Sequence, residues 1–264
     1  MRAERRARQR YSEVIVGGLK TARLSRESMT SLMVDDCIAS RRRARKPRLI
    51  FTANGHSIAL AATNPKFRAQ LELANMIHAD GQPVVWVSKL TKSPIPERTA
   101  TTDFIHDAAA AAEQNGLTFF LLGANEEINA RCADALKAAY PKLQIAGRRH
   151  GYFTPAEELA VCEEINASGA DIVWVGLGVP YEQEFSVRNK ERLTAGWMVT
   201  SGGCFNFVAG DYSRAPQWMQ ALGLEWLYRM LREPRRLFWR YLTTNPVAVA
   251  MMLLRTRSSG AERP

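Results

Sequence analysis

Asp80 is the first candidate for chemistry, because a carboxylate in a partly dry pocket can take a proton from a hydroxyl group. It precedes Gly81 and follows His78 by two residues, and the polar segment 52–56 (Thr-Ala-Asn-Gly-His) closes an earlier apolar run. An Asp in such a turn is often no more than a local cap. The residues alone therefore leave two interpretations open for Asp80: a general base, or a turn residue at the edge of a strand expected at 84–87.

A second candidate region begins at Ser201, where the segment Ser-Gly-Gly-Cys-Phe-Asn-Phe-Val-Ala-Gly follows an apolar run and offers flexible backbone N–H donors. Arginines follow at positions 214, 229, 232, 235, 236 and 240. A guanidinium can hold a phosphate through two parallel hydrogen bonds. The same arginines could instead form an exposed basic face that balances Glu225 and Glu233, and Pro234 interrupts any single helix through them.

A third segment, Gly-Leu-Gly-Val-Pro at 176–180, resembles the start of a dinucleotide-binding turn. Tyr181 stands where the third glycine of that motif would be, and the segment comes late in the chain, so binding of a nicotinamide dinucleotide is disfavoured. Two interpretations remain: a structural turn, or a turn that contacts the phosphate or sugar of a nucleotide-sugar.

No metal or other cofactor is expected from the sequence. The histidines at 56, 78, 106 and 150 are scattered, and no Asp-x-Asp pair is present. The absence of a Gly-x-Ser-x-Gly turn and of a Walker loop disfavours hydrolases and NTPases. Cysteines at 37, 132, 162 and 204 form no C-x-x-C pair, which favours a reducing cytosolic setting.

The elements that must position these residues alternate between short apolar runs and amphipathic stretches. Strands are expected near 49–51, 84–87, 118–122, 143–145, 171–175 and 197–199, and helices near 65–75, 101–114, 125–139, 155–167 and 181–193. This alternation predicts an α/β fold, a mostly parallel, Rossmann-like sheet with helices on both faces. Ligands bind such sheets at the carboxyl ends of the strands, so the turns after the strands should carry the site.

Three regions are expected along the chain. Residues 1–12 form a basic tail that we expect to be disordered, residues 13–212 form the α/β core, and residues 213–264 form a helical appendage rich in Arg and Trp. The core should open with a hairpin at 13–24 and a helix at 26–40. The basic run 41–47 is either a solvated connector or a contact for phosphate or anionic lipid. Pro234 and Pro246 should break the appendage into pieces.

Charge and hydropathy restrict the partners. With 264 residues, a net charge of +10 and a pI near 9.8, the chain favours a polyanion: nucleic acid, an anionic membrane surface or a phosphorylated substrate. We expect no signal peptide and no membrane span, because no run of about 18 apolar residues occurs. Membrane contact should therefore be peripheral, through Phe238, Trp239, Tyr241 and the apolar run 251–254.

Several blocks in order resemble the WecG/TagA/CpsF family of glycosyltransferases over residues 13–245. The blocks are Thr-Ala-Asn at 52–54, Ala-Asp-Gly-Gln-Pro-Val-Val at 79–85, Leu-Gly-Ala at 122–124, Tyr-Pro at 140–141, Gly-Tyr-Phe at 151–153, Gly-Ala-Asp at 169–171, Gly-Leu-Gly-Val-Pro at 176–180, Gly-Gly-Cys-Phe at 202–205, Arg-Ala-Pro at 214–216 and Leu-Glu-Trp-Leu-Tyr-Arg at 224–229. The order and spacing of these blocks are highly specific.

The resemblance implies metal-independent transfer of a sugar from a UDP-sugar to a sugar on a polyprenyl diphosphate, with inversion. It implies Asp80 as general base and an appendage that closes the site at the membrane. The substrate-binding residues expected from motif and resemblance are Thr52, Asn54, Gly81, Gly176, Gly178, Glu182, Gln183, Gly202, Gly203, Arg214, Arg229 and Arg236. Donor sugars in the family are glucose, N-acetylmannosamine and its uronic acid.

Two positions depart from the family pattern. Many members have Gln-Glu where this chain has Glu182-Gln183, and Thr101 replaces a frequent glycine. Two rival functions use the same composition: a basic nucleic-acid-binding protein, and a membrane-docked scaffold without catalysis. We expect no nucleic acid as a partner, because Trp218 and Trp226 lie on the apolar face expected for the appendage. The expected setting is the inner face of the bacterial plasma membrane, and assembly of identical copies stays open.

Overall fold

The structure is a computed structural model that describes residues 10–42 and 46–259. Its centre is a six-stranded sheet with the strand order β4-β3-β8-β7-β5-β6, in which every pairing is parallel. The strands are β3 (Arg48–Ala53), β4 (Met76–Ala79), β5 (Thr118–Gly123), β6 (Gln144–Arg149), β7 (Ile172–Gly176) and β8 (Trp197–Thr200). The predicted parallel α/β fold is confirmed. Most of the predicted basic tail lies outside the described residues, as does the middle of the basic run 41–47.

Alternating side chains of the central strands feed two separate apolar cores, one on each face of the sheet. In β5, Phe120 and Leu122 point to one core and Phe119 and Leu121 to the other. The first core is covered by α3 (Gly55–Thr63), α4 (Pro65–Glu72), α5 (Gln82–Ser88), α8 (Glu158–Ser168) and α9 (Tyr181–Asn189). The second is covered by α2 (Arg26–Arg42), α6 (Thr101–Asn115), α7 (Glu126–Ala139) and α10 (Cys204–Val208). Helices therefore cover both faces, as predicted.

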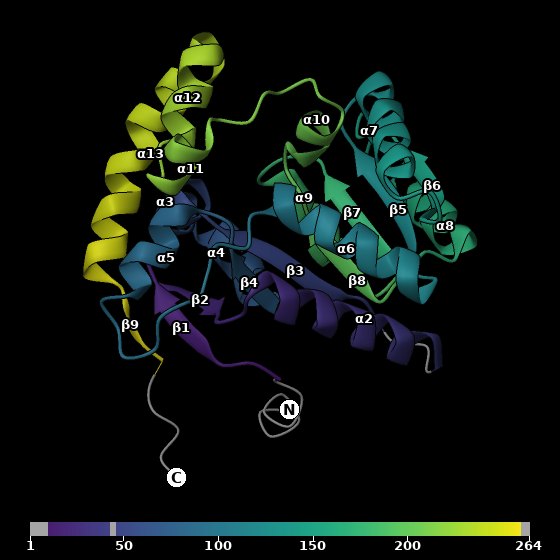
Figure 1. Cartoon of the computed structure of the whole chain (residues 1–264), viewed down its shortest axis with the longest axis horizontal. Helices are drawn as coiled ribbons and strands as arrows, with labels where there is room; N and C mark the ends of the chain where they lie inside the picture. The colour runs from purple at the N-terminus through teal and green to yellow at the C-terminus, as the bar shows by residue number, and fades with distance from the viewer. Residues whose placement is uncertain (1–9, 43–45, 260–264) are drawn as a thin grey trace.

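The last helices lie together at one end of the fold, beside α3 and α5 (Figure 1). They are α11 (Gln217–Ala221), α12 (Glu225–Arg232) and α13 (Pro234–Leu254). Helix α13 packs closely along α3, where a Cβ added to Gly55 would lie only 3.6 Å from Ala248 Cβ. Along the described ranges, no helix combines the length and the apolar character needed to cross a membrane.

A small antiparallel sheet joins the two ends of the described chain. Strands β1 (Glu13–Val16) and β2 (Leu19–Ala22) form the predicted hairpin, and β9 (Arg257–Ser258) pairs with β1 on its other side. Gly17 at the hairpin turn has a positive φ of 59°, a conformation that glycine adopts without strain. The segment that follows α13 is thus anchored to the N-terminal hairpin.

Two local predictions were wrong. Residues 84–87 lie in helix α5 and not in a strand, because Gly81 caps the helix and Pro83 sits in its first turn, where no intrahelical N–H is needed. Val84 and its neighbour Val85 are both buried, which fits a helix face and not a strand that alternates. Pro246 was expected to break the appendage but lies inside α13, where Ala248 and Met252, which follow it, pack into the first core and maintain the helix. The break at Pro234 is confirmed.

Candidate active site

Asp80 follows β4 directly, so it lies at the carboxyl edge of the sheet and not before a strand. Its backbone N–H donates to the Ala53 carbonyl at 3.0 Å, which ties it to the end of the neighbouring strand β3. Asn54, the residue after β3, caps helix α3: its side-chain oxygen accepts from Ser57 N at 3.0 Å. Thr52 pairs in register with His78 across the same two strands. The polar residues noted around Asp80 in the sequence therefore lie together.

The Asp80 carboxylate is held by three hydrogen bonds. Its Oδ1 accepts from the backbone N–H of Thr101 at 2.9 Å and from the Thr101 hydroxyl at 3.1 Å, and its Oδ2 accepts from Asn54 Nδ2 at 3.1 Å. Burial acts to raise the pKa of Asp80, but Arg98, the Thr101 amide, His78 and Asn54 outweigh it and bring the pKa below its usual value. Asp80 is therefore ionised at neutral pH and can act as an acceptor.

His78 lies behind Asp80 as a neutral, enclosed side chain. Its Nδ1 is 2.8 Å from the Thr99 carbonyl, and burial lowers its pKa despite the nearby Asp80 charge. A neutral ring with its proton on Nδ1 makes that contact a hydrogen bond to a carbonyl. His78 therefore supports the end of β4 and the segment 98–101, and it does not reach solvent.

The glycine turns after β7 and β8 are linked by one carboxylate. Glu182 Oε2 accepts from Gly178 N at 3.1 Å and from Gly202 N at 2.8 Å, and the side chain is only 1% exposed. Burial raises the pKa of Glu182 to about 7, although the Gly202 and Gly178 amides and Gln183 act to lower it. The two amides that the sequence offered to a ligand thus serve Glu182 in this structure. Gln183 is equally buried.

Gly176 has a packing role at the same edge. A Cβ on the neighbouring Gly123 would lie 2.3 Å from the Gly176 carbonyl oxygen, and a Cβ on Gly176 itself would lie 3.2 Å from the Gly202 carbonyl oxygen. Only glycines allow the turns after β5, β7 and β8 to approach this closely. The turn at 176–178 is therefore at least a structural turn.

Arg214 is held by three other side chains. Its Nη1 donates to Asp103 Oδ1 at 2.8 Å, its Nη2 donates to Gln220 Oε1 at 2.6 Å, and its Nε lies 3.4 Å from Glu225 Oε1. Asp103 is in the first turn of α6, so Arg214 ties the start of the C-terminal segment to the core. Arg214 is near the site, and two of its donors are taken, whereas its Nε has no hydrogen-bond partner among the described residues.

Arg229 is in a different state, because the structure shows no hydrogen-bond acceptor for its guanidinium among the described residues. The guanidinium lies over the rings of Phe207, at 5.3 Å, and Tyr212, at 5.9 Å. Gly203 is close by, since a Cβ added there would lie 3.9 Å from Arg229 Nη2. Arg229 therefore presents unused donors beside the second glycine turn.

Arg236, on helix α13 beyond the break at Pro234, also contacts the Tyr212 ring. It lies over Tyr212 at 5.7 Å, donates from Nη2 to the Tyr212 hydroxyl at 3.3 Å and pairs with Glu233 at 2.6 Å. The structure thus brings Arg229 and Arg236 together around Tyr212, although they lie on different helices.

Three residues that contribute contacts to the site were not predicted from the sequence. Arg98 donates from Nε to the Asp80 carbonyl at 2.7 Å, and Glu225 accepts from Arg98 Nη2 at 2.8 Å. Tyr212 provides the ring shared by two arginines. In the sequence, Thr101 stood out only because it replaces a frequent glycine of the family. That departure was the one indication of its contact with Asp80.

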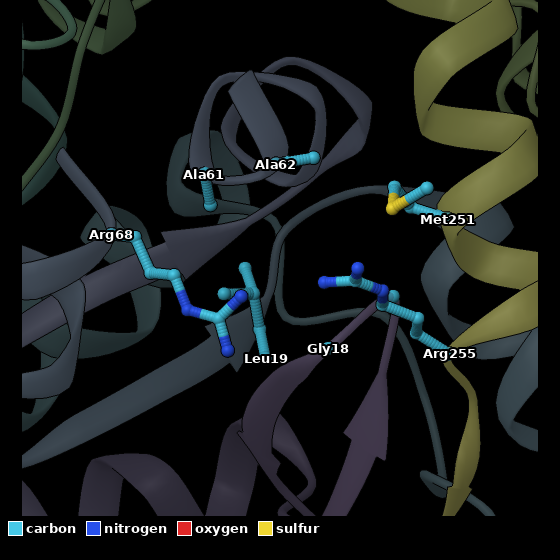
Figure 2. Close-up of a pocket in the computed structure, with 8 residues that line it drawn as sticks. Gly18, Leu19, Ala61, Ala62, Arg68, Met251 and Arg255 are labelled. Carbon is cyan, nitrogen blue, oxygen red and sulfur yellow. The ribbon is translucent and has the colours of Figure 1, made fainter. Parts of the chain in front are cut away.

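Within the ranges that the structure describes, no group of three His, Cys, Asp or Glu side chains could hold a metal ion. A small hollow lies away from Asp80, between the β1–β2 turn, the end of α3 and the end of α13 (Figure 2). Arg68 and Arg255 reach toward it, and it is lined otherwise by glycine and apolar side chains. It contains none of the residues predicted for the site.

Comparisons with known proteins agree with the resemblance seen in the sequence blocks. Residues 13–262 match the model of the glycosyl transferase WecG/TagA/CpsF family. A relative from Bacillus spizizenii (strain ATCC 23059 / NRRL B-14472 / W23) is 34% identical over 214 residues, which cover 81% of this chain and 82% of the relative. That relative is an N-acetylglucosaminyldiphosphoundecaprenol N-acetyl-beta-D-mannosaminyltransferase.

Proposed function

The chain belongs to the WecG/TagA/CpsF family of glycosyltransferases, and on this premise we propose that it moves a hexosyl group from a UDP-sugar to a sugar carried on a polyprenyl diphosphate. The name of the Bacillus relative favours N-acetylmannosamine as the transferred sugar and N-acetylglucosamine as the acceptor sugar. Glucose and the uronic acid of N-acetylmannosamine are the other donors to test. The product would serve the synthesis of a bacterial cell-surface polysaccharide or an exopolysaccharide.

The position and hydrogen bonds of Asp80 carry the proposal. Each carboxylate oxygen has two lone pairs; Oδ1 already accepts two hydrogen bonds from Thr101, whereas Oδ2 accepts one, from Asn54. Oδ2 therefore retains a lone pair and is the oxygen that would take the proton of the acceptor hydroxyl. That hydroxyl oxygen then bonds to the anomeric carbon, the bond from this carbon to the UDP oxygen breaks, and its electron pair leaves with UDP. One displacement of this kind inverts the anomeric carbon.

The diphosphate would lie near the C-terminal helices. The unused donors of Arg229 beside Gly203 and the adjacent guanidinium of Arg236 fit the negative charge that develops on leaving UDP. Thr52, near the end of β3, and Asn54, which follows β3, would contact the sugar or the acceptor. Glu182 and Gln183 are enclosed by the protein, so their contribution would come through the glycine turns that they hold.

The outer surface of α13 supports docking on an anionic membrane surface. Trp239 is 69% exposed, and Phe238, Leu242 and Leu253 are exposed on the same helix, with Arg235 among them. An apolar helix face bordered by arginines suits the headgroup region of a bilayer. The enzyme would then meet its lipid-linked acceptor at the inner face of the plasma membrane. A second copy of the chain is the other occupant to test.

The variant Asp80→Asn tests the proposed base. We expect kcat to fall by about 10³-fold, because a positioned base contributes roughly 10² to 10⁴, while the Kd for the UDP-sugar stays close to that of the wild type. Because the pKa of Asp80 is lowered, wild-type kcat should be lost only as the pH falls below the usual Asp range. The measurement is UDP release with short-chain prenyl diphosphate acceptors, screened across the three donors.

Asp134→Asn, on the exposed side of α7, is the matched control and should transfer normally. A circular dichroism spectrum and a melting curve confirm that each variant is folded. Near-normal transfer by Asp80→Asn would remove Asp80 as the base.

A further inference from the structure

Glu225, in the first turn of α12, joins the C-terminal helices to the segment that surrounds Asp80. Its Oε2 accepts from Arg98 Nη2 at 2.8 Å, and its Oε1 lies 3.4 Å from Arg214 Nε. The Glu225 and Arg98 side chains are only 15% and 18% exposed. A pair shielded to this degree is screened less by salt than an open surface pair.

Arg98 carries this contact onward to Asp80. The same guanidinium that holds Glu225 donates from Nε to the Asp80 backbone carbonyl at 2.7 Å. Thr101, three residues later, donates from its backbone N–H and its hydroxyl to the Asp80 carboxylate. Residues 98–101 therefore hold both the backbone and the side chain of Asp80.

Arg214 provides a second route from Glu225 to the same place. It donates to Asp103, in the first turn of α6, and α6 begins at Thr101. Glu225 is thus connected through Arg98 to the start of the segment 98–101 and through Arg214 to the helix α6 that follows it.

We infer that Glu225 is a positioning residue for sugar transfer: by holding Arg98 and Arg214 together, it fixes the Asp80 carboxylate when the C-terminal helices are seated on the core. The inference rests on the proposed role of Asp80. Without the carboxylate, two shielded guanidinium groups lose an acceptor, and Arg98 is free to leave the Asp80 carbonyl. A misplacement of about 1 Å can cost a catalytic site about 10²-fold in rate.

Arg98 also affects the protonation of Asp80. Burial acts to raise the pKa of Asp80, and the charge of Arg98 is the strongest of the influences that lower it, ahead of the Thr101 amide, His78 and Asn54. The negative charge of Asp80 also acts on the buried Glu182, where it adds to the rise in the pKa of that carboxyl group. Displacement of Arg98 should therefore raise the pKa of Asp80.

The first test is Glu225→Gln in the full-length chain, which keeps the size of the side chain and removes its charge. We expect kcat to fall by roughly 10- to 100-fold, with the KM for the UDP-sugar within about threefold of the wild type, as expected for an effect on positioning and not on donor binding. The ¹³C carboxyl NMR signal of Asp80, assigned by its loss in Asp80→Asn, should titrate at higher pH. The control, Glu72→Gln, removes an exposed pair with Arg68 on α4 and should leave kcat unchanged.

A charge swap, Arg98→Glu with Glu225→Arg, separates positioning from simple stability. The swap restores an ion pair between positions 98 and 225 but sets an arginine against Arg214, so the melting temperature should recover only in part. Glu at position 98 cannot donate to the Asp80 carbonyl, so kcat should stay low. Wild-type kcat in Glu225→Gln, or recovery of kcat in the swap, would overturn the inference. Failure of the proposed function would show separately, as normal transfer by Asp80→Asn.

Discussion

Charged side chains in the α/β core and in the C-terminal helices satisfy their hydrogen bonds in different ways. In the core, Asp171 accepts from Arg41 at 2.7 and 2.6 Å and from Thr118 N at 2.8 Å, and Glu182 accepts from two glycine amides. In the C-terminal helices, Arg229 lies against aromatic rings with no acceptor for its guanidinium among the described residues. The charges of Asp171 and Glu182 serve the fold, whereas Arg229 on α12 keeps donors that we propose for a ligand.

This difference changes where the negative charge of a substrate should be recognised. Glycine turns at the carboxyl edge of a parallel sheet usually offer their amides to phosphate. Here Glu182 already occupies the amides of Gly178 and Gly202. Recognition of the diphosphate is therefore expected to depend on guanidinium groups that come from outside the sheet.

The variant Arg229→Ala tests this comparison and should have the largest effect on activity. We expect kcat/KM to fall by about 100-fold, since loss of charge-assisted hydrogen bonds to a leaving phosphate costs about 3 kcal/mol of transition-state stabilisation. The melting temperature should fall by only a few degrees, because the guanidinium bonds to no acceptor among the described residues and loses only its contacts with the rings of Phe207 and Tyr212. The assay uses a water-soluble short-prenyl acceptor.

Arg235→Ala is the matched control for Arg229→Ala, because Arg235 is an exposed arginine of the neighbouring helix α13. In the soluble assay it should retain wild-type kcat/KM. If Arg229→Ala lost less than about threefold in kcat/KM, the contrast between the two regions would not extend to function.

Glu182→Gln tests the core side of the comparison through stability. The folded-state pKa of Glu182 is raised to about 7, so the stability that its protonation provides is complete below the unfolded value, near 4.5, and is lost as the pH rises through 7. Gln stays neutral, keeps an acceptor for the two amides and can donate to Gln183 Oε1, which has no partner in the structure. We therefore expect the variant to gain about 2 kcal/mol in unfolding free energy relative to the wild type between pH 5 and pH 8.

Urea unfolding of both proteins at the two pH values measures this difference. A Glu182→Gln variant that differs from the wild type equally at pH 5 and pH 8 would show that the buried carboxyl does not titrate in this range. If the Glu182→Gln variant also retains the wild-type kcat at pH 5, this would further support a structural role of Glu182.

The smallest expected effect concerns the outer surface of α13. Arg235→Ala should weaken binding to vesicles that contain anionic lipid by about fivefold, since one arginine near such a surface contributes about 1 kcal/mol. Binding to neutral vesicles should be unchanged. Absence of wild-type binding to either vesicle type would argue against docking and favour a second copy as the occupant, which sedimentation would detect.

Much of the fold could be predicted because β3, β5, β7 and β8 are apolar runs with clear ends. Strand β4 could not, because Met-Ile-His-Ala carries a histidine whose buried ring contacts Thr99 and Phe104, two residues that are distant in the sequence. The apolar run at 84–87 favours a strand by composition, but Gly81 and Pro83 start a helix there, and packing decides for the helix. Local patterns therefore failed where a partner distant in the sequence determines the outcome.

The same limit applies to the site. Thr52, Asn54 and Asp80 could be grouped from the sequence, because the carboxyl ends of parallel strands meet at one edge. The contact between Arg98 and Glu225 spans 127 positions, and no local pattern indicates it. The sequence also did not indicate that Glu182 accepts from the glycine amides, since a carboxylate after a glycine turn could equally well contact a ligand.

The pairing of β9 with β1 also has a consequence for the order of events during synthesis. Gly17 N donates to Thr256 Oγ1 across 239 positions, so the N-terminal hairpin gains its third strand only after that length of chain has been made. At about 5 to 20 residues per second, this interval lasts on the order of tens of seconds. During that time the first apolar core lacks Ala248 and Met252 of α13, and the N-terminal hairpin lacks its third strand.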